Sequence, residues 1–146
     1  MNDFRKVTET FFASPQISAA DIAEAASMGF AIVINNRPDG EAPDQPEGAE
    51  IAQAVRHLGM EYRAIPIGQG GFAEPQISAM VDVLAGATGK VLAYCRSGTR
   101  STFLWSLAQA QQGADPDQIA QAAADAGYDI SPIRAGVDML AAKARG

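Results

Sequence analysis

The sequence predicts an α/β domain whose central, mostly parallel sheet is covered by helices on both faces. Two short apolar runs, 30–34 and 90–94, are typical of buried strands. Longer segments with helical spacing of apolar residues separate the predicted strands, which favours parallel pairing with right-handed crossovers. The chain has 146 residues, the usual size of one domain, so we expect residues 1–146 to form a single domain.

Strands and helices alternate in the first half of the chain. A short strand is expected at 10–13. Ser18 and Asp21 fit a capping box at the start of a helix that ends near Gly29. The elements expected after it are a buried strand at 30–34, a polar loop at 35–45, a helix at 47–58 and a strand at 61–67.

The second half is predicted to carry one more strand and several helices. The elements expected there are a flexible turn at 68–71, a helix at 76–84, a strand at 90–94, a loop at 95–100, and helices at 101–112, 119–126 and 133–144. Gly136 is expected to interrupt the last helix.

Charge and composition exclude several classes of partner. The formal net charge of −6 argues against nucleic acid or an anionic membrane as the main partner. No apolar run approaches the roughly 18 residues of a membrane-spanning helix, and the start of the chain lacks the apolar stretch of a signal peptide. The single cysteine cannot form an internal disulfide, so we expect a reducing, cytoplasmic location. The net charge does not exclude a small anionic ligand, because a local cluster of N–H groups and arginines can bind it.

The loop at 95–100 has the composition of an anion site. It connects a buried strand to a helix, so backbone N–H groups and the positive end of the helix dipole would face a bound anion. Gly98 permits the unusual backbone angles of a tight turn, and Arg100 can offer a planar fork to two oxygens. Three hydroxyls could donate to the anion or to the thiol, those of Ser97, Thr99 and Ser101.

Cys95 is the candidate nucleophile. A thiol beside a helix N-terminus and a guanidinium is favoured as the thiolate, which is the reactive form. The alternative is a cysteine that only packs at the end of a strand. The neighbouring Arg96, Arg100 and Gly98 favour the functional interpretation. No histidine base is required, and the one histidine, His57, is expected on a helix surface.

Two further arginines have open roles. Arg37 follows a predicted strand, where it could contact the anion or form a salt bridge to Asp39 or Glu41. Arg96 could recognise substrate at the rim of the loop or be solvated. A structural metal is not expected, because a second histidine or cysteine is missing, and no cofactor is predicted.

Residues 95–101 resemble the active-site loop of rhodanese sulfurtransferases and, in longer form, of protein tyrosine and dual-specificity phosphatases. The wider chain resembles a bacterial family of beta-lactamase hydrolase-like, phosphatase-like proteins. The segments that carry this resemblance are 14–18, 34–41, 65–67 and 94–101. The resemblance implies a protein-tyrosine-phosphatase-like α/β fold, and it leaves the reaction open.

Two features of the sequence distinguish sulfur transfer from phosphate ester hydrolysis: the length of the cysteine loop and the lack of an aspartate where a phosphatase would place its general acid. In tyrosine-type phosphatases five residues separate the cysteine from the arginine, whereas four separate Cys95 from Arg100, as in the rhodanese loop. Those phosphatases also use an aspartate from another loop as general acid. The segment 68–74 offers only Glu74, and the acidic residues elsewhere that could swing over are Asp39, Glu41 and Asp44.

These arguments favour a sulfurtransferase that forms a persulfide on Cys95, stabilised by Arg100, and passes the sulfur to a thiol. The expected substrates are thiosulfate or a glutathione persulfide. The first alternative is hydrolysis of phosphate esters through a phosphocysteine. The second is an anion-binding or regulatory module without catalysis. The residues expected to bind substrate are Arg37, Arg96, Ser97, Gly98, Thr99 and Ser101.

Overall fold

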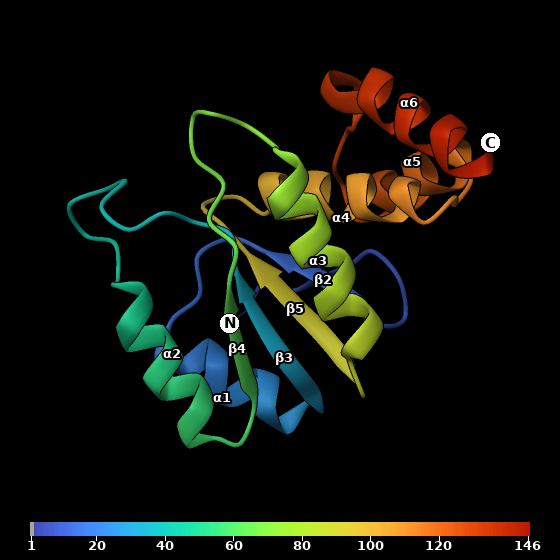
Figure 1. Cartoon of the computed structure of the whole chain (residues 1–146). Helices are drawn as coiled ribbons and strands as arrows, with labels where there is room; N and C mark the ends of the chain where they lie inside the picture. Colours follow the sequence, from blue (N-terminus) through green and yellow to red (C-terminus); the bar gives the residue numbers. More distant parts are fainter. Residues whose placement is uncertain (1) are drawn as a thin grey trace.

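The computed structural model describes residues 2–146 and contains a five-stranded sheet in the order β1-β2-β5-β3-β4 (Figure 1). The strands are β1 (Arg5–Lys6), β2 (Phe11–Ser14), β3 (Phe30–Asn35), β4 (Glu61–Ala64) and β5 (Lys90–Tyr94). β1 pairs antiparallel with β2, and every other pair is parallel. The predicted fold class, a mostly parallel sheet, is therefore confirmed.

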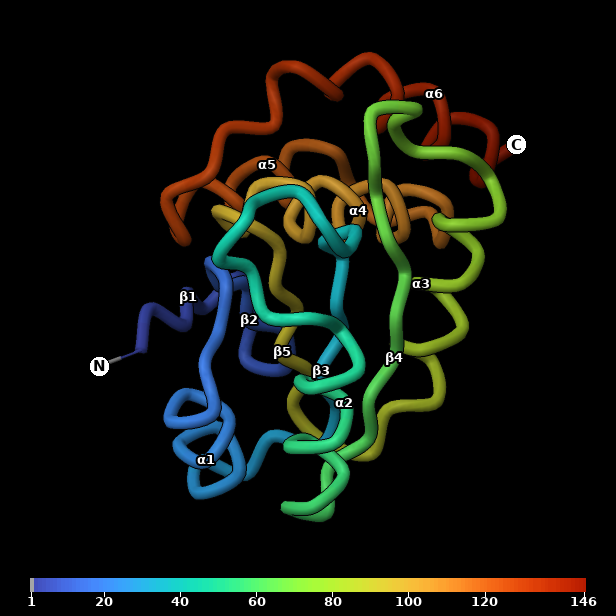
Figure 2. Tube along the Cα trace, turned by 90° about the vertical axis from the view of Figure 1, so that its left-hand side faces the viewer, coloured from blue at the N-terminus to red at the C-terminus, as the bar shows by residue number. Residues whose placement is uncertain are grey.

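Six α-helices surround the sheet in the described residues. They are α1 (Ala19–Ser27), α2 (Gly48–His57), α3 (Glu74–Gly86), α4 (Thr99–Gln111), α5 (Pro116–Asp125) and α6 (Arg134–Arg145), with a short 3₁₀ turn at Ser131–Ile133. α1 and α2 lie on one side of the sheet, whereas α3 and α4 cover the other (Figures 1 and 2). α5 and α6 pack beyond α4, at the C-terminal end of the chain.

Strand β5 shows how alternation builds two cores. Val91 and Ala93 face the larger core under α3 to α6, whereas Leu92 and Tyr94 face the smaller core under α1 and α2. All four side chains are buried, as expected for a central parallel strand. The two cores hold β5 rigidly from both faces, so the chain leaves the sheet after Tyr94 at a fixed point.

Most predicted boundaries lie within two residues of those found, and the capping box of Ser18 and Asp21 is present at the start of α1. The strand expected at 61–67 ends earlier, at Ala64, and the helix expected at 119–126 begins earlier, at Pro116. The helix expected at 101–112 begins earlier, at Thr99, because Gly98 takes the N-cap position. Gly136 does not interrupt α6, which is continuous. A Cβ at Gly136 would lie 3.6 Å from Leu107 Cδ2 of α4, an ordinary van der Waals distance, so the packing against α4 does not require glycine there. The two-residue strand β1 was not predicted.

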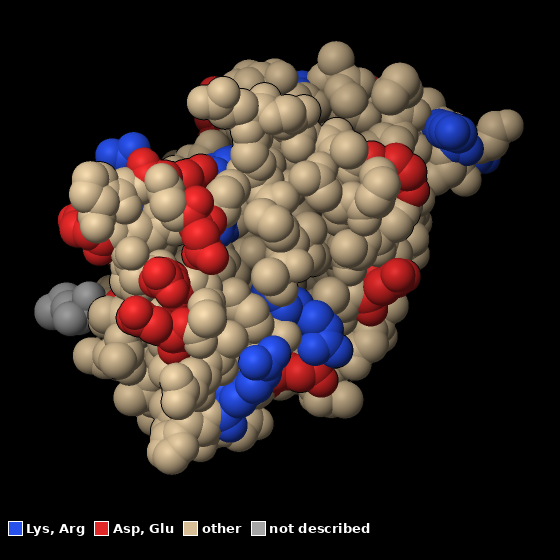
Figure 3. All heavy atoms as spheres, turned by 60° about the vertical axis from the view of Figure 1, so that its left-hand side comes forward, with Lys and Arg blue, Asp and Glu red and all other residues tan. Residues whose placement is uncertain are grey.

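Parallel strands β3 and β5 are neighbours, so the segments after them leave the same edge of the sheet. Figure 2 shows the β3–α2 connection passing beside the start of α4. Acidic side chains cover more of the face in Figure 3 than basic ones do, in line with the net charge of −6. Within residues 2–146, no helix is long and apolar enough to cross a membrane.

Candidate active site

Cys95 lies at the carboxyl edge of the sheet, directly after β5. Its side chain is fully buried, with 0% exposure. The backbone N–H of Cys95 donates to the Ser14 carbonyl, and this bond extends the pairing of β5 with β2 past the end of the strand. The Gly98 N–H points at the Cys95 Sγ, with an N–S distance of 3.1 Å. The loop therefore already directs one backbone donor at the sulfur.

Gly98 makes this turn possible for two reasons. Its φ of +92° lies in the left-handed region that glycine adopts without steric cost. A Cβ at this position would lie 2.0 Å from the Tyr128 hydroxyl oxygen, so a side chain cannot fit. Helix α4 begins at the next residue, and its positive end faces the thiol.

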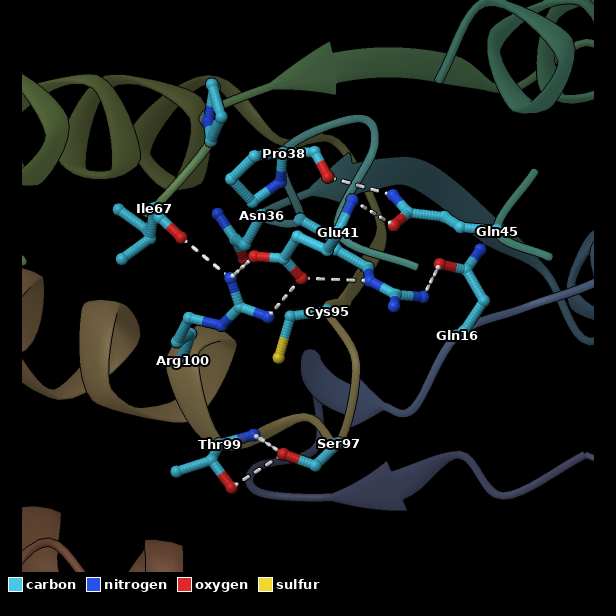
Figure 4. A network of polar contacts seen from close by, with 12 residues as sticks. Gln16, Asn36, Pro38, Glu41, Gln45, Ile67, Cys95, Ser97, Thr99 and Arg100 are labelled. Atoms are coloured by element: carbon cyan, nitrogen blue, oxygen red, sulfur yellow. Dashed lines mark hydrogen bonds and ion pairs between the residues drawn. The ribbon is translucent and has the colours of Figure 1, made fainter. Parts of the chain in front are cut away.

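Arg100 lies in the first turn of α4 and extends over the site (Figure 4). Its Nη1 donates to the Ile67 carbonyl and to Glu41 Oε2, both at 2.7 Å, and its Nη2 donates to Glu41 Oε1 at 2.9 Å. The guanidinium of Arg100 therefore already binds a carboxylate of the protein itself, that of Glu41. An anionic substrate that uses this guanidinium must exchange places with Glu41.

Glu41 is shared between two arginines. Arg37 Nε donates to Glu41 Oε1 at 3.0 Å, and Arg37 Nη1 donates to Gln16 Oε1 at 3.0 Å. The hydrogen bonds from Arg100 and then Arg37 lower the pKa of Glu41 from 4.5 to about 2, although partial burial opposes the shift. Arg37 therefore forms one of the two salt bridges considered for it, and its side chain is buried, with 5% exposure.

The remaining residues of this segment differ in their exposure and in their hydrogen-bond partners. Ser97 Oγ donates to Thr99 Oγ1, so these two hydroxyls pair with each other at the exposed rim (Figure 4). Ser101 is fully buried, and its hydroxyl has no hydrogen-bond partner among the described residues. Arg96 is exposed, and no hydrogen bond or ion pair joins its side chain to residues 2–146. The structure thus gathers Gly98, Arg100 and, through Glu41, Arg37 near Cys95.

The acidic residues considered as proton donors either form ion pairs or hydrogen bonds with other groups or are exposed to solvent. Glu41 is ionised between two arginines, and Asp39 Oδ1 accepts the Gly48 N–H at 2.8 Å. Glu74 begins α3 and accepts a hydrogen bond from Ser78. Asp44 is exposed in the β3–α2 loop. Across residues 2–146, no group of three or more metal-binding side chains is present.

Two contacts of this site were not predicted from the sequence. The pairing of Glu41 with Arg100 joins residues 59 positions apart; Glu41 had been considered as a salt-bridge partner of Arg37 and as an acid, but not as a partner of Arg100. Tyr128 donates its hydroxyl to the Ser97 carbonyl at 3.0 Å, from the far side of the loop. Nothing in the local sequence around Tyr128 indicates this contact.

Comparison with known proteins places this site in a family. The sequence model of the family described as "Beta-lactamase hydrolase-like protein, phosphatase-like domain" matches residues 3–112. A beta-lactamase hydrolase-like protein of Agrobacterium fabrum is 35% identical over 108 residues, which are 74% of this chain and 25% of that protein. The chain thus spans about a quarter of the length of the curated relatives that it matches.

Solved structures agree with this assignment. The crystal structure of a proposed phosphatase from Neisseria meningitidis has a TM-score of 0.84 and 30% identity, and the match covers 96% of this chain and 99% of that one. A kinase-associated phosphatase has a TM-score of 0.74 at 15% identity, covering 93% of this chain and 86% of that one, which shows a shared fold. The fold is thus protein-tyrosine-phosphatase-like, and these findings together support an enzyme. The chain belongs to the phosphatase-like domain family of the beta-lactamase hydrolase-like proteins.

Proposed function

We propose that Cys95 is the nucleophile of a phosphatase-like enzyme that hydrolyses small phosphate monoesters. The observation that carries this proposal is the direction of the Gly98 N–H toward the Cys95 Sγ, at the start of α4 and beside Arg100. Such a cradle stabilises a thiolate and also binds the anionic group that the thiolate attacks. The family description and the similarity to the Neisseria protein support phosphate esters as the substrate class.

The reaction would proceed in two displacements. The Cys95 thiolate attacks phosphorus, the bond from phosphorus to the ester oxygen breaks, and a phosphocysteine forms. Water then attacks phosphorus, the S–P bond breaks, and inorganic phosphate leaves with the thiolate restored. Arg100 would release Glu41 and turn its fork to the phosphoryl oxygens, where charge is concentrated.

The state of Glu41 restricts the leaving group. A carboxylate with a pKa of about 2 holds no proton to give at neutral pH. When Arg100 turns to the substrate, the hydrogen bond from Arg37 would remain and would still favour the ionised form of Glu41, which is therefore a poor general acid. Esters whose leaving oxygen needs no protonation, such as aryl phosphates, would therefore react fastest. We infer that alkyl phosphates are poor substrates unless Asp39, Asp44 or Glu74 moves toward the thiol.

Sulfur transfer is the second candidate, and the sequence alone favoured it. Two observations support it: only four residues separate Cys95 from Arg100, and the thiol is fully buried, which suits a small donor such as thiosulfate. The thiolate would attack the sulfane sulfur, the S–S bond would break, and sulfite would leave. A thiolate acceptor would then take the outer sulfur from the Cys95 persulfide, and no general acid is needed. The comparisons support phosphate hydrolysis better than this reaction.

The deciding experiment is paired turnover on one preparation of the wild type and Cys95→Ser. One assay follows phosphate release from an aryl phosphate, and the other follows sulfur transfer from thiosulfate to cyanide or glutathione. Phosphate release that the variant lacks supports the first proposal, and sulfur transfer alone supports the second. Failure of both reactions would favour an anion-binding module. We further propose that the chain is a single domain and works in the cytoplasm, where its one thiol stays reduced.

A further inference from the structure

One peptide unit of the Cys95 loop has a partner on each side. The Gly98 N–H donates to the Cys95 Sγ at 3.1 Å, and the Ser97 carbonyl accepts the Tyr128 hydroxyl at 3.0 Å. These two groups belong to the same planar trans peptide, so they point in opposite directions. Any contact that fixes the carbonyl also fixes the N–H on the sulfur.

Gly98 does not hold this peptide in place by itself. Glycine adopts positive and negative φ about equally readily, so the same freedom that allows φ of +92° also allows the peptide to turn over. A half turn would aim the Ser97 carbonyl oxygen at the sulfur and remove the donor. The sulfur would then face a partial negative charge, which disfavours the thiolate. A second contact is therefore needed to keep the N–H inward.

Tyr128 is held firmly enough to be that contact. It is 7% exposed, and the guanidinium of Arg5 lies over its ring, 5.2 Å from the centroid. Its backbone N–H donates to the Ala123 carbonyl at the end of α5. Burial raises the pKa of the Tyr128 hydroxyl, which stays protonated and able to donate at neutral pH.

The missing side chain of Gly98 fits the same interpretation. An ideal Cβ there would lie 2.0 Å from the Tyr128 hydroxyl oxygen and 2.9 Å from Cζ. The loop therefore leaves space for this tyrosine to approach the peptide directly. Tyr128 lies beyond residues 3–112, the part of the chain that the family model matches.

We propose that Tyr128 is a positioning residue that locks the Ser97–Gly98 peptide with its N–H on the Cys95 sulfur, so that the C-terminal segment controls the reactivity of the thiol. This role rests on the proposed function only in taking Cys95 as the nucleophile. Tyr128 acts through the backbone and touches no reacting atom.

The test is the rate of Cys95 alkylation by iodoacetamide as a function of pH, in the wild type and in Tyr128→Phe. Cys95 is the only cysteine of the chain, so the readout is clean and needs no substrate. Tyr128→Phe keeps the ring and removes the donor, and we expect alkylation at neutral pH to slow about fivefold, the loss that corresponds to one hydrogen bond of about 1 kcal/mol. The pH profile should shift toward higher pH.

The matched control is Tyr62→Phe, which removes a hydroxyl that accepts a hydrogen bond from Asn35 at 3.0 Å. Both variants are compared at equal fraction folded, from their melting curves. An unchanged rate and profile in Tyr128→Phe would overturn the proposal, and so would an equal slowing in Tyr62→Phe.

A second measurement keeps the proposal testable if Tyr128→Phe lowers stability. The amide proton of Gly98, followed by NMR, should respond to ionisation of the thiol in the wild type and lose much of that response in Tyr128→Phe. An equal response in both proteins would overturn the proposal. Neither readout depends on turnover, so a protein without phosphatase or sulfurtransferase activity could still confirm the role of Tyr128.

Discussion

Two loops meet over Cys95, and they are built in different ways. The loop of residues 95–98 is short, and its chemical groups are backbone N–H groups directed by Gly98 and Tyr128. The β3–α2 loop, residues 36–47, is long, and side chains hold it: Gln45 bonds Pro38 and Glu41 within it (Figure 4). The short loop offers positive partial charge to an anion. The long loop brings an anion of its own, Glu41, to the same place.

The comparison shows that binding and exclusion of anions are separated in the sequence. The groups that attract an anion follow β5, whereas the carboxylate that occupies the Arg100 fork follows β3. The two loops meet because their strands are parallel neighbours. Substitutions of the groups that follow β5 should therefore weaken anion binding, whereas substitution of Glu41 should strengthen it.

The largest effect is expected on the attracting side, for Arg100→Lys. Lysine keeps the charge but loses the planar fork, and loss of such a contact costs about a hundredfold in kcat/KM. Arg96→Lys makes the same chemical change at an exposed position in the loop that precedes α4, and should alter kcat/KM by less than about threefold. Steady-state kinetics on the substrate that the wild type turns over checks both. Equal losses would mean that the two arginines bind substrate alike.

The short loop was predictable because its signals are local. An apolar run from Val91 to Tyr94 indicates a central strand, and the glycine that follows three residues after Cys95 indicates a turn into a helix. The boundary of α4 was wrong by two residues, because Gly98 itself serves as the N-cap and places Arg100 in the helix. The local pattern thus predicted the loop that holds Cys95 but placed Arg100 outside the helix, whereas it lies in the first turn of α4.

The long loop was not predictable in the same way. Which of Asp39, Glu41 and Asp44 would reach Arg100 depends on how a loop without regular structure packs over a neighbouring strand, and sequence spacing does not encode this. Tyr128 is a similar case, because it reaches Ser97 from a turn after α5. Contacts between distant segments form only when the whole sheet and its helices are in place.

A smaller effect is expected on the excluding side, for Glu41→Gln. Removing a negative charge that directly contacts Arg100 should raise the affinity for inorganic phosphate about tenfold at low salt, since a charge pair near a protein surface interacts by a few kcal/mol and only part is recovered. Isothermal titration calorimetry measures this affinity. Asp44→Asn removes the same charge from the same loop without touching Arg100, and should change the affinity less. Weaker phosphate binding in Glu41→Gln would mean instead that Glu41 positions Arg100 for the substrate.

The smallest effect is a pH dependence of stability that belongs to Glu41. Its pKa is about 2 in the folded protein and 4.5 ordinarily, so the ionised carboxylate stabilises the fold above pH 4.5, and this contribution is lost as the pH falls toward 2. Because the ion pairs are partly exposed, with 28% of Glu41 accessible, we expect about 1 kcal/mol rather than the full value of the shift. Urea unfolding of the wild type and Glu41→Gln at several pH values isolates it, since the other carboxyl groups titrate in both proteins. The difference in free energy of unfolding should be largest at neutral pH and should shrink toward zero near pH 2. A difference that stays constant with pH would mean that Glu41 stabilises the loop through packing, and that its ion pairs with Arg100 and Arg37 contribute nothing to stability.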